Sequence, residues 1–213
     1  MLVRDVMSTN VVTIPSNTSL ADARQIMEAH HIRRLPVVDK SKLVGIITRD
    51  SLDKAGPSKL TTFSIQELTY LLGKLTVKEA MTTELVTISP DATVEESVAL
   101  AQARKVGAIL VIEENKLVGI VTVTDLFFRI LNPILGIDKA GVRIHIHNCG
   151  EVEKVTGVLK VISEFKLKTV TMFTLAHPET GVPDFTVHLD TSDASKVVEE
   201  LTKRGFDVHE RAR

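Results

Sequence analysis

The sequence predicts an α/β (α+β) protein built from two copies of a β-α-β-β-α unit and a third segment of order β-α-β-β-α-β. The chain repeats itself, since KLVGIITRDSL at 42–52 returns as KLVGIVTVTDL at 116–126. Apolar residues follow the helical period in some stretches and the strand period of two in others. Segments rich in glycine and proline separate the parts. These three observations carry the prediction.

The repeat has a constant offset over the first part of the chain. Aligning Gly45 with Gly119 gives an offset of 74 residues (119 minus 45), which also pairs Met7 with Met81. The duplication therefore runs from about residue 1 to residue 130. One copy of about 50 residues would bury its apolar face poorly on its own. We therefore expect the two copies to pack face to face as a pseudo-twofold module.

Each copy contains the same series of elements. A short strand, VVTI or LVTI, leads to a helix whose start, SLAD or TVEE, has the form of a capping box. Two strand-like runs follow as a hairpin, LPVVD with KLVGIIT and ILVIE with KLVGIVT, and a second helix begins at DSL or TDL. The apolar positions of the first helix recur with the helical period, and they are Leu20, Ala23, Ile26 and Met27 in one copy and Val94, Val98, Leu100 and Ala101 in the other.

The third segment has the pattern of a separate domain. VRIHIHN and DFTVHLD alternate apolar and polar residues, EKVTGVLKVISEF and DASKVVEELTKRG are amphipathic helices, and DVHERAR is a last strand. This order is the split βαβ, ferredoxin-like arrangement. The predicted boundaries are 1–56 and 77–132 for the copies, 57–76 for a linker helix, 133–141 for a breaker-rich linker and 142–213 for the third segment.

The linker helix is predicted from Ser64, with Glu67 three residues later, ahead of an apolar side. It is either a packed connecting helix or a dimer contact.

Composition excludes few function classes but favours a cytoplasmic location. A net charge of -1 gives no general reason to bind nucleic acid or an acidic membrane surface. The single cysteine, Cys149, cannot form an internal disulfide. The start of the chain lacks the pattern of a signal peptide, and no stretch approaches the roughly 20 apolar residues of a membrane helix. We therefore expect no nucleic-acid or membrane partner.

The repeated motifs resemble a known regulatory module. The segments IRRLPVVD, LVGIIT and LVGIVTVTDL make the first 130 residues similar to a tandem pair of CBS domains. Residues 142–213 resemble an ACT domain, with NCGEVEKV where that family has an acidic residue, Pro and Gly before its first helix; Gly150 matches, whereas Asn148 and Cys149 depart from the pattern. Together the parts resemble the acetoin-utilisation regulatory (CBS-ACT) protein family.

The resemblance implies an adenosine-nucleotide site in a cleft between the copies. An acidic side chain would accept the ribose hydroxyls, hydroxyl side chains would serve the phosphate, and cations from the other copy would balance its charge. Asp125 fills the first role, Thr122 and Thr124 the second, and the two arginines of IRRLP the third. The implied site comprises Thr13, Ile14, Arg33, Arg34, Leu35, Pro36, Thr122, Thr124 and Asp125.

The first copy departs from this pattern at the pseudo-symmetric position. Ser51 aligns with Asp125, and Asp50 stands one residue too early, a slip that rotates a side chain by about 100° at a helix start. The facing segment, VGAIL, carries no cation. We therefore predict one competent nucleotide site per chain and one degenerate site near Thr48, Ser51, Thr87 and Ala108. The alternative is a repeat kept for the fold alone, with Asp125 capping the second helix and the arginines solvated.

Histidines gather in the third segment. Strict alternation turns Val142, Ile144 and Ile146 toward the helices, which places the histidines of VRIHIHN and also Cys149 on the other face. A polar or partner-covered face is expected there, so no metal is predicted. The alternatives are a pH-sensitive dimer face and a transition-metal site of neutral imidazoles, whose candidate ligands are His145, His147, His188 and His209.

The sequence contains no catalytic motif that survives inspection. It has no G-x-S-x-G elbow, Walker A loop or H-E-x-x-H, and Cys149 has no identifiable oxyanion hole. We therefore predict a non-enzymatic regulatory sensor, without a catalytic cofactor, that binds AMP, ADP or ATP and signals to the ACT-like domain or a partner enzyme. S-adenosylmethionine is a further possible ligand, and a homodimer is expected. The rival hypothesis is a ligand-independent scaffold that regulates a partner enzyme in acetoin utilisation.

Overall fold

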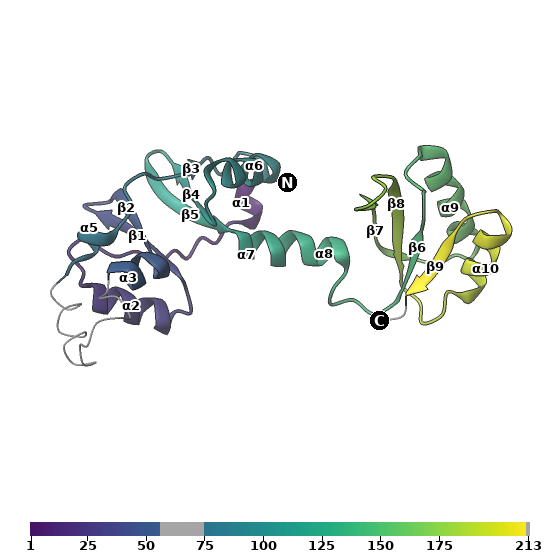
Figure 1. Cartoon of the computed structure of the whole chain (residues 1–213), viewed down its shortest axis with the longest axis horizontal. Coiled ribbons are helices and arrows are strands. Elements are labelled where there is room, and N and C mark those ends of the chain that lie inside the picture. Colours follow the sequence, from purple (N-terminus) through teal and green to yellow (C-terminus); the bar gives the residue numbers. More distant parts are fainter. Residues whose placement is uncertain (56–74, 212–213) are drawn as a thin grey trace. The chain divides into compact units, whose positions relative to one another are not determined.

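The computed structural model describes residues 1–55 and 75–211. They fall into two compact units, Met1–Leu126 and Phe127–Arg213, and each combines helices with β-sheet (Figure 1). The α+β class predicted from the sequence is therefore confirmed. Most of the predicted linker helix, residues 57–74 of 57–76, lies outside the described residues.

The first copy has a shorter sheet than expected. Its elements are α1 (Val3–Val6), α2 (Leu20–Ala29), β1 (Arg34–Asp39), β2 (Lys42–Thr48) and α3 (Arg49–Ala55). The prediction of a strand at VVTI was wrong, because only a single parallel bridge joins Ile14 to Val37. In the second copy, the Leu110 amide donates to the Val86 carbonyl (3.0 Å) and extends the pairing. Pro36 aligns with Leu110 and has no N–H to donate, so the pairing stops at the bridge.

The second copy repeats the hairpin of the first with the same register. Its elements are α5 (Val77–Ala80), β3 (Thr87–Ile88), α6 (Val94–Arg104), β4 (Ala108–Glu113), β5 (Lys116–Thr122) and α7 (Val123–Leu126). The β1–β2 and β4–β5 pairs are antiparallel, with an irregularity at equivalent places, Val37/Val38 and Val111/Ile112. The internal repeat is thus a structural repeat.

The helix starts follow the predicted caps, one of them only in part. Thr93 and Glu96 form a complete capping box at α6. At α2 the Ser19 hydroxyl accepts from the Asp22 amide (3.0 Å), while Asp22 accepts from the same hydroxyl (2.7 Å) instead of from a backbone N–H. Three of the predicted apolar positions of α2 are buried, Leu20, Ala23 and Met27, whereas α6 buries Val94 and Ser97.

The two copies exchange their leading segments. The Val3 amide donates to the Ala92 carbonyl (2.9 Å), and Ser8 pairs with Ile120 in both directions. The equivalent segment of the second copy returns to the first, where the Val77 amide donates to the Thr18 carbonyl (2.8 Å). Sequence reasoning did not foresee this exchange, which brings residues 1–8 against the second copy.

The second unit has the ferredoxin-like order predicted for it. Its sheet runs β7-β8-β6-β9 with antiparallel neighbours, and the first strand lies between the third and the fourth. The predicted linker at 133–141 is partly helical, because Pro133 occupies the first turn of α8 and Gly136 ends it at φ 59°. The elements are η1 (Phe127–Leu131), α8 (Asn132–Leu135), β6 (Val142–Ile146), α9 (Val152–Glu164), β7 (Thr169–Ala176), β8 (Pro183–Leu189), α10 (Ser195–Lys203) and β9 (Val208–Arg211).

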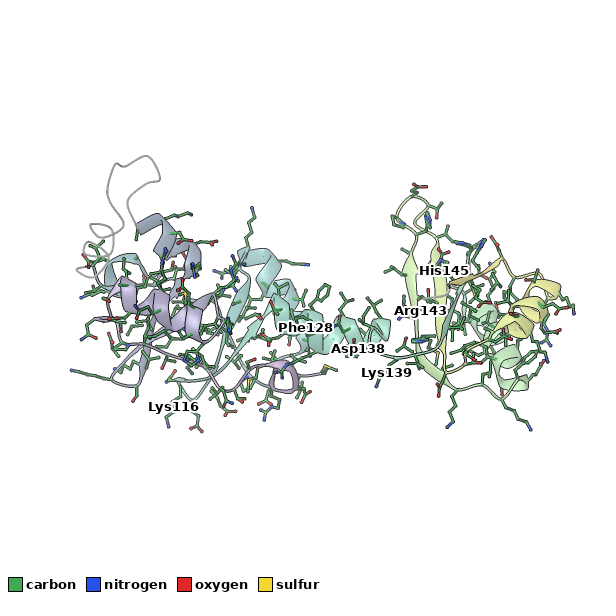
Figure 2. The ribbon with its side chains drawn as sticks, turned by 90° about the horizontal axis from the view of Figure 1, so that it is seen from below. Lys116, Phe128, Asp138, Lys139, Arg143 and His145 are labelled. Atoms are coloured by element: carbon green, nitrogen blue, oxygen red, sulfur yellow. The ribbon has the colours of Figure 1, made fainter. Side chains whose placement is uncertain are left out.

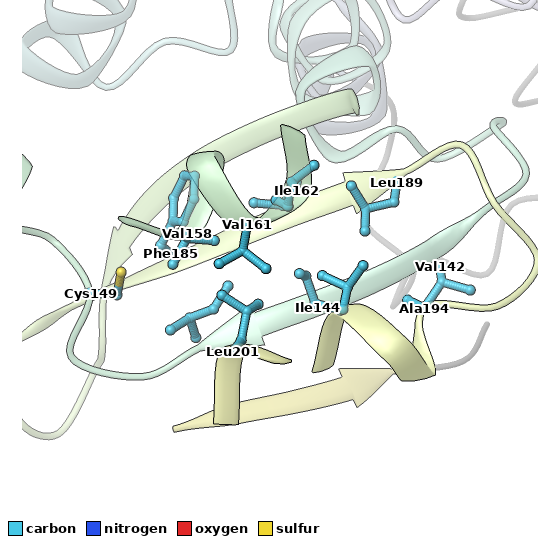
Figure 3. Close-up of a cluster of buried hydrophobic side chains, with 13 residues drawn as sticks. Val142, Ile144, Cys149, Val158, Val161, Ile162, Phe185, Leu189, Ala194 and Leu201 are labelled. Atoms are coloured by element: carbon cyan, nitrogen blue, oxygen red, sulfur yellow. The ribbon is translucent and has the colours of Figure 1, made fainter. Parts of the chain in front are cut away.

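The core of this unit lies between the sheet and the helices α9 and α10 (Figure 3). Ile144, Ile146 and Leu201 are fully buried there, and so is Cys149. The prediction that Cys149 lies on the outer face was wrong. Asn148 adopts φ 50°, so the chain turns after β6 and the strand alternation ends before it reaches the cysteine.

Candidate functional site

The site begins where β5 passes into α7. The Thr122 hydroxyl accepts from the Asp125 amide (3.2 Å), and Asp125 Oδ2 accepts from the Thr122 amide (2.9 Å) and from its hydroxyl (2.5 Å). Thr122 and Asp125 therefore form a capping box at the start of the helix. Asp125 thus caps the helix through Oδ2, the role that the sequence offered as an alternative. Its other oxygen, Oδ1, has a different hydrogen-bond partner.

The exchanged N-terminal segment supplies a further partner of Asp125. The Ser8 hydroxyl donates to Asp125 Oδ1 at 3.0 Å. Ser8 is held in place because its backbone pairs with Ile120 of β5, two residues before Thr122. The carboxylate is thus oriented by residues from both ends of the module.

A cavity of about 340 Å³ opens beside Asp125. Six of the residues implied by the family resemblance line it, namely Arg33, Arg34, Pro36, Thr122, Thr124 and Asp125. Residues that sequence reasoning missed complete the lining: Ser8, Asn10, Val11, Val12, His31, Ile32 and Ile120. The cavity therefore draws on both copies and combines a carboxylate, two guanidinium groups, hydroxyls and an apolar wall.

Three implied residues do not line this cavity. Ile14 and Leu35 are buried in the core of the first copy. Thr13 lines a different cavity, which it shares with Lys116 and Leu117. Val12 lines the cavity beside Asp125, its neighbour Thr13 lines the other cavity, and Val11 lines both. In this segment the residues that line the cavity beside Asp125 are Val11 and Val12, not Thr13 and Ile14.

A second, more polar cavity of about 290 Å³ is lined by three of the same residues, Arg33, Arg34 and Thr124. Asp50 and Gly107 are among its other lining residues. Burial, followed by the neighbouring charge of Arg33, lowers the pKa of Arg34 below its usual value, and Asp50 opposes this change. The two arginines thus concentrate positive charge at the join of the two cavities.

The pseudo-symmetric position in the first copy has different chemistry. Ser51 takes the place of Asp125, and its hydroxyl lies 2.9 Å from the Thr48 hydroxyl, with the Ser51 amide donating to the same oxygen (3.1 Å). Only half of a capping box remains, without a carboxylate. Thr87 is exposed on β3, and Ala108 is half-buried on β4. Asp50 aligns with Thr124 and lines the cavity that also contains Arg34.

The second unit brings together some of its predicted histidines. His145 and His147 lie beside Asp184, and the three side chains can place one ligand atom each within 4.8 Å of one another. His209 packs edge-on against His147, with ring centroids 5.1 Å apart. His188 does not join them: it is buried, and its Nε2 lies 3.1 Å from the Ala140 carbonyl. The sequence pattern gave no signal for Asp184.

Comparison with known proteins identifies the first unit. A sequence model of the family described as CBS domain matches residues 3–57 and 77–132, which together make up slightly more than half of the chain. The inosine-5'-monophosphate dehydrogenase of Korarchaeum cryptofilum is 32% identical over 133 residues. That match covers 62% of this chain and only 25% of the dehydrogenase, so the chain spans about a quarter of that relative's length.

Two solved structures resemble the chain over the same region. A protein assigned to acetoin utilization (AcuB) of Vibrio cholerae has a TM-score of 0.53 and 30% identity, and the match covers 66% of this chain and 98% of that one. The CBS domain pair of protein MJ0100, in complex with 5'-methylthioadenosine and S-adenosyl-L-methionine, has a TM-score of 0.50 and 30% identity over 65% of this chain and 98% of that one. Among the described residues, no helix has the length and apolar character to cross a membrane.

Proposed function

The chain belongs to the CBS domain family, and from this premise we propose that its two copies together bind an adenosine-containing ligand in the cavity beside Asp125. The observation that carries the proposal is that Asp125 of the second copy and Arg33 and Arg34 of the first copy line one cavity. The chain would act as a regulatory sensor without catalysis. No step of bond making or breaking is assigned to it.

The lining residues suit the parts of a nucleotide. Ribose hydroxyls can donate to the Asp125 carboxylate, as the Ser8 hydroxyl already does. Val11, Val12 and Ile32 offer an apolar wall for a purine ring. A volume of about 340 Å³ lies within the range of roughly 300–1,000 Å³ of small-molecule sites. The adenosine ligands of the MJ0100 domain pair support the same ligand class.

The neighbouring polar cavity suggests where phosphates would lie. It shares Arg33, Arg34 and Thr124 with the first cavity. Guanidinium groups pair well with phosphate oxygens, often in a bidentate manner. We therefore favour an anionic nucleotide, AMP, ADP or ATP, and keep S-adenosylmethionine as the alternative. The pseudo-symmetric position, with Ser51 in place of the carboxylate, would not bind.

The wider role remains part of the proposal. Ligand binding would change how the two copies pack, and the change would reach the ACT-like second unit or a partner enzyme. A homodimer in the cytoplasm is the state we propose. The likeness to AcuB makes acetoin utilization the context to test first.

Isothermal titration calorimetry with AMP, ADP, ATP and S-adenosylmethionine tests the site. We expect saturation near one ligand per chain and a loss of at least about tenfold in affinity, 1.4 kcal/mol, for Asp125→Asn. The asparagine keeps a carbonyl oxygen that can accept from the Thr122 amide, so the cap survives. Ser51→Ala changes the aligned position of the first copy and is the matched control, with affinity expected to be unchanged.

The rival function is a scaffold that works without ligand. Its specific support is that Asp125 already completes a capping box and accepts from Ser8, contacts that serve the fold. No binding of any of the four compounds to a folded chain would favour this rival. A partner enzyme recovered equally well with and without nucleotide would point the same way.

A further inference from the structure

We propose that His145, His147 and Asp184, called here the histidine-aspartate cluster, form a binding site for one divalent transition-metal ion of the zinc class. The cluster belongs to the second unit, outside the CBS copies. The proposal does not depend on the nucleotide site.

The sheet register builds the cluster. His145 and Arg143 lie on β6 and face away from the core, which Ile144 and Ile146 enter from the same strand (Figure 2). Ile146 pairs with Phe185 of β8, so the next residue on one strand, His147, meets the preceding residue on the other, Asp184. Two imidazoles and a carboxylate thus converge from two adjacent strands.

Two of the three separations among the ligand atoms already suit a bound ion, and all three atoms lie within 4.8 Å of one another. Asp184 Oδ2 lies 3.2 Å from His145 Nε2 and 3.3 Å from His147 Nδ1. A tetrahedral ion with bonds of about 2.0–2.1 Å separates its ligand atoms by about 3.3–3.4 Å. Charge-assisted hydrogen bonds between nitrogen and a carboxylate are shorter, about 2.7–2.9 Å. The two separations therefore match the edges of a tetrahedral site better than they match two strong hydrogen bonds.

Neighbouring groups orient the ligands. The Asn148 amide donates to Asp184 Oδ1 at 2.9 Å, which leaves Oδ2 directed toward the histidines. The second ring nitrogen of His145, Nδ1, lies 2.9 Å from the Thr186 hydroxyl. Metal-binding histidines characteristically make such a contact through the nitrogen that does not bind the ion. Thr186 is therefore a positioning residue of the site.

Burial and access also fit an ion. Asp184 is only 6% exposed, and a buried carboxylate needs positive charge or hydrogen bonds to offset its desolvation. A cavity of about 490 Å³ is lined by His145, Asp184 and Thr186, so an ion bound there could keep a position open to a small ligand. Two nitrogens and one carboxylate oxygen are a ligand set that zinc accepts.

Calorimetric titration of the full chain, free of any histidine tag, with Zn²⁺ tests the site. We expect about one ion per chain, a loss of at least tenfold in affinity for His147→Ala and for Asp184→Asn, and about a tenfold loss for Thr186→Val. His30→Ala removes an exposed histidine of the first unit as the control, and we expect no change. Circular dichroism of each ion-free variant checks that the fold is kept.

Two results would overturn the site: no saturable Zn²⁺ binding, or binding that is equally tight in the wild type and both folded ligand variants. Visible absorption of the Co²⁺-loaded chain gives a second readout, with the bands of a four-coordinate ion expected in the wild type and lost in His147→Ala. Asp125→Asn should bind Zn²⁺ like the wild type. A failed metal site and a failed nucleotide site can therefore be told apart.

Discussion

The Arg34 side chain of the first CBS copy extends to Gly107 of the second. A Cβ atom built at Gly107 would lie 2.5 Å from Arg34 Nη2, closer than real atoms approach. Gly107 supplies no cation to the second copy, and its missing side chain makes room for the guanidinium group of Arg34 from the first copy. The absence of a side chain at Gly107 and the placement of the Arg34 guanidinium are linked through this contact.

Gly107→Ala should weaken nucleotide binding while leaving the fold intact. The added methyl group meets only the end of a flexible side chain, so Arg34 moves away from the cavities at little cost to stability. We expect a loss of several-fold to tenfold in affinity by calorimetry, and a midpoint of thermal unfolding within about 2 °C of the wild type. In an Arg34→Ala background, the same substitution should have no further effect on affinity. An equal loss in both backgrounds would contradict this account.

The pseudo-twofold repeat offers a matched pair of glycine substitutions. A Cβ atom at Gly119 would lie 2.6 Å from Met7 Sδ and 3.2 Å from the Ser8 carbonyl oxygen. Gly45 has the same relation to Met81 and Thr82, at 2.5 and 3.2 Å. Overpacking of this kind costs about 1–3 kcal/mol.

We expect Gly119→Ala and Gly45→Ala to lower the free energy of unfolding, measured with urea, by similar amounts. Only Gly119→Ala should also weaken nucleotide binding, because it displaces the segment that carries Ser8, the partner of Asp125. If Gly45→Ala weakened nucleotide binding as much as Gly119→Ala does, the loss of affinity would follow from reduced stability alone.

The capping box at α6 should give the stability of the chain a dependence on acid pH. The Thr93 amide and hydroxyl donate to Glu96 Oε2, at 2.7 and 3.1 Å, and lower the pKa of Glu96 below its usual value. The contribution of the charged group is thus complete above the unfolded pKa of about 4.3 and is lost as the pH falls through the lower folded value.

Glu96→Gln should therefore be less stable than the wild type at pH 7, and the difference should shrink below about pH 4. Urea unfolding followed by circular dichroism between pH 7 and pH 3 measures it. Glu95→Gln removes a charge from the same turn while the Thr93–Glu96 pair stays, so it serves as the control. A difference between wild type and Glu96→Gln that is constant over this range would refute the role of the carboxylate charge.

Cys149 should be unreactive in the folded chain. Its side chain is fully buried in the core of the second unit, and burial raises the pKa of the thiol above its usual value. Alkylation by iodoacetamide at pH 8 should be slow in the folded state and rapid in 6 M guanidinium chloride, as followed by mass spectrometry. Rapid labelling of the native chain would contradict this burial.

Much of the site could be predicted from the sequence where it rests on the repeat. The offset that aligns Ser51 with Asp125 identified the different helix starts, and the structure shows a complete capping box at one and half a box at the other. The arginines of IRRLP were placed beside Asp125 by family resemblance, and they line the same cavity. The same resemblance also implied Thr13 and Ile14, which do not line this cavity, because the face of a short extended segment that turns inward is set by tertiary packing.

The sequence by itself determined the duplication, the hairpins and main helices of both copies, the ferredoxin-like strand order and the departure of Ser51 from Asp125. These features depend on periodicity and on residues close in the chain, which a linear pattern records. Only the tertiary structure decided that Ser8 reaches Asp125, that Arg34 reaches Gly107, that Asp184 joins His145 and His147, and that Cys149 enters the core. The first three are contacts between distant residues and follow from segment exchange and strand register. The last follows from one turn at Asn148, which ends the strand period.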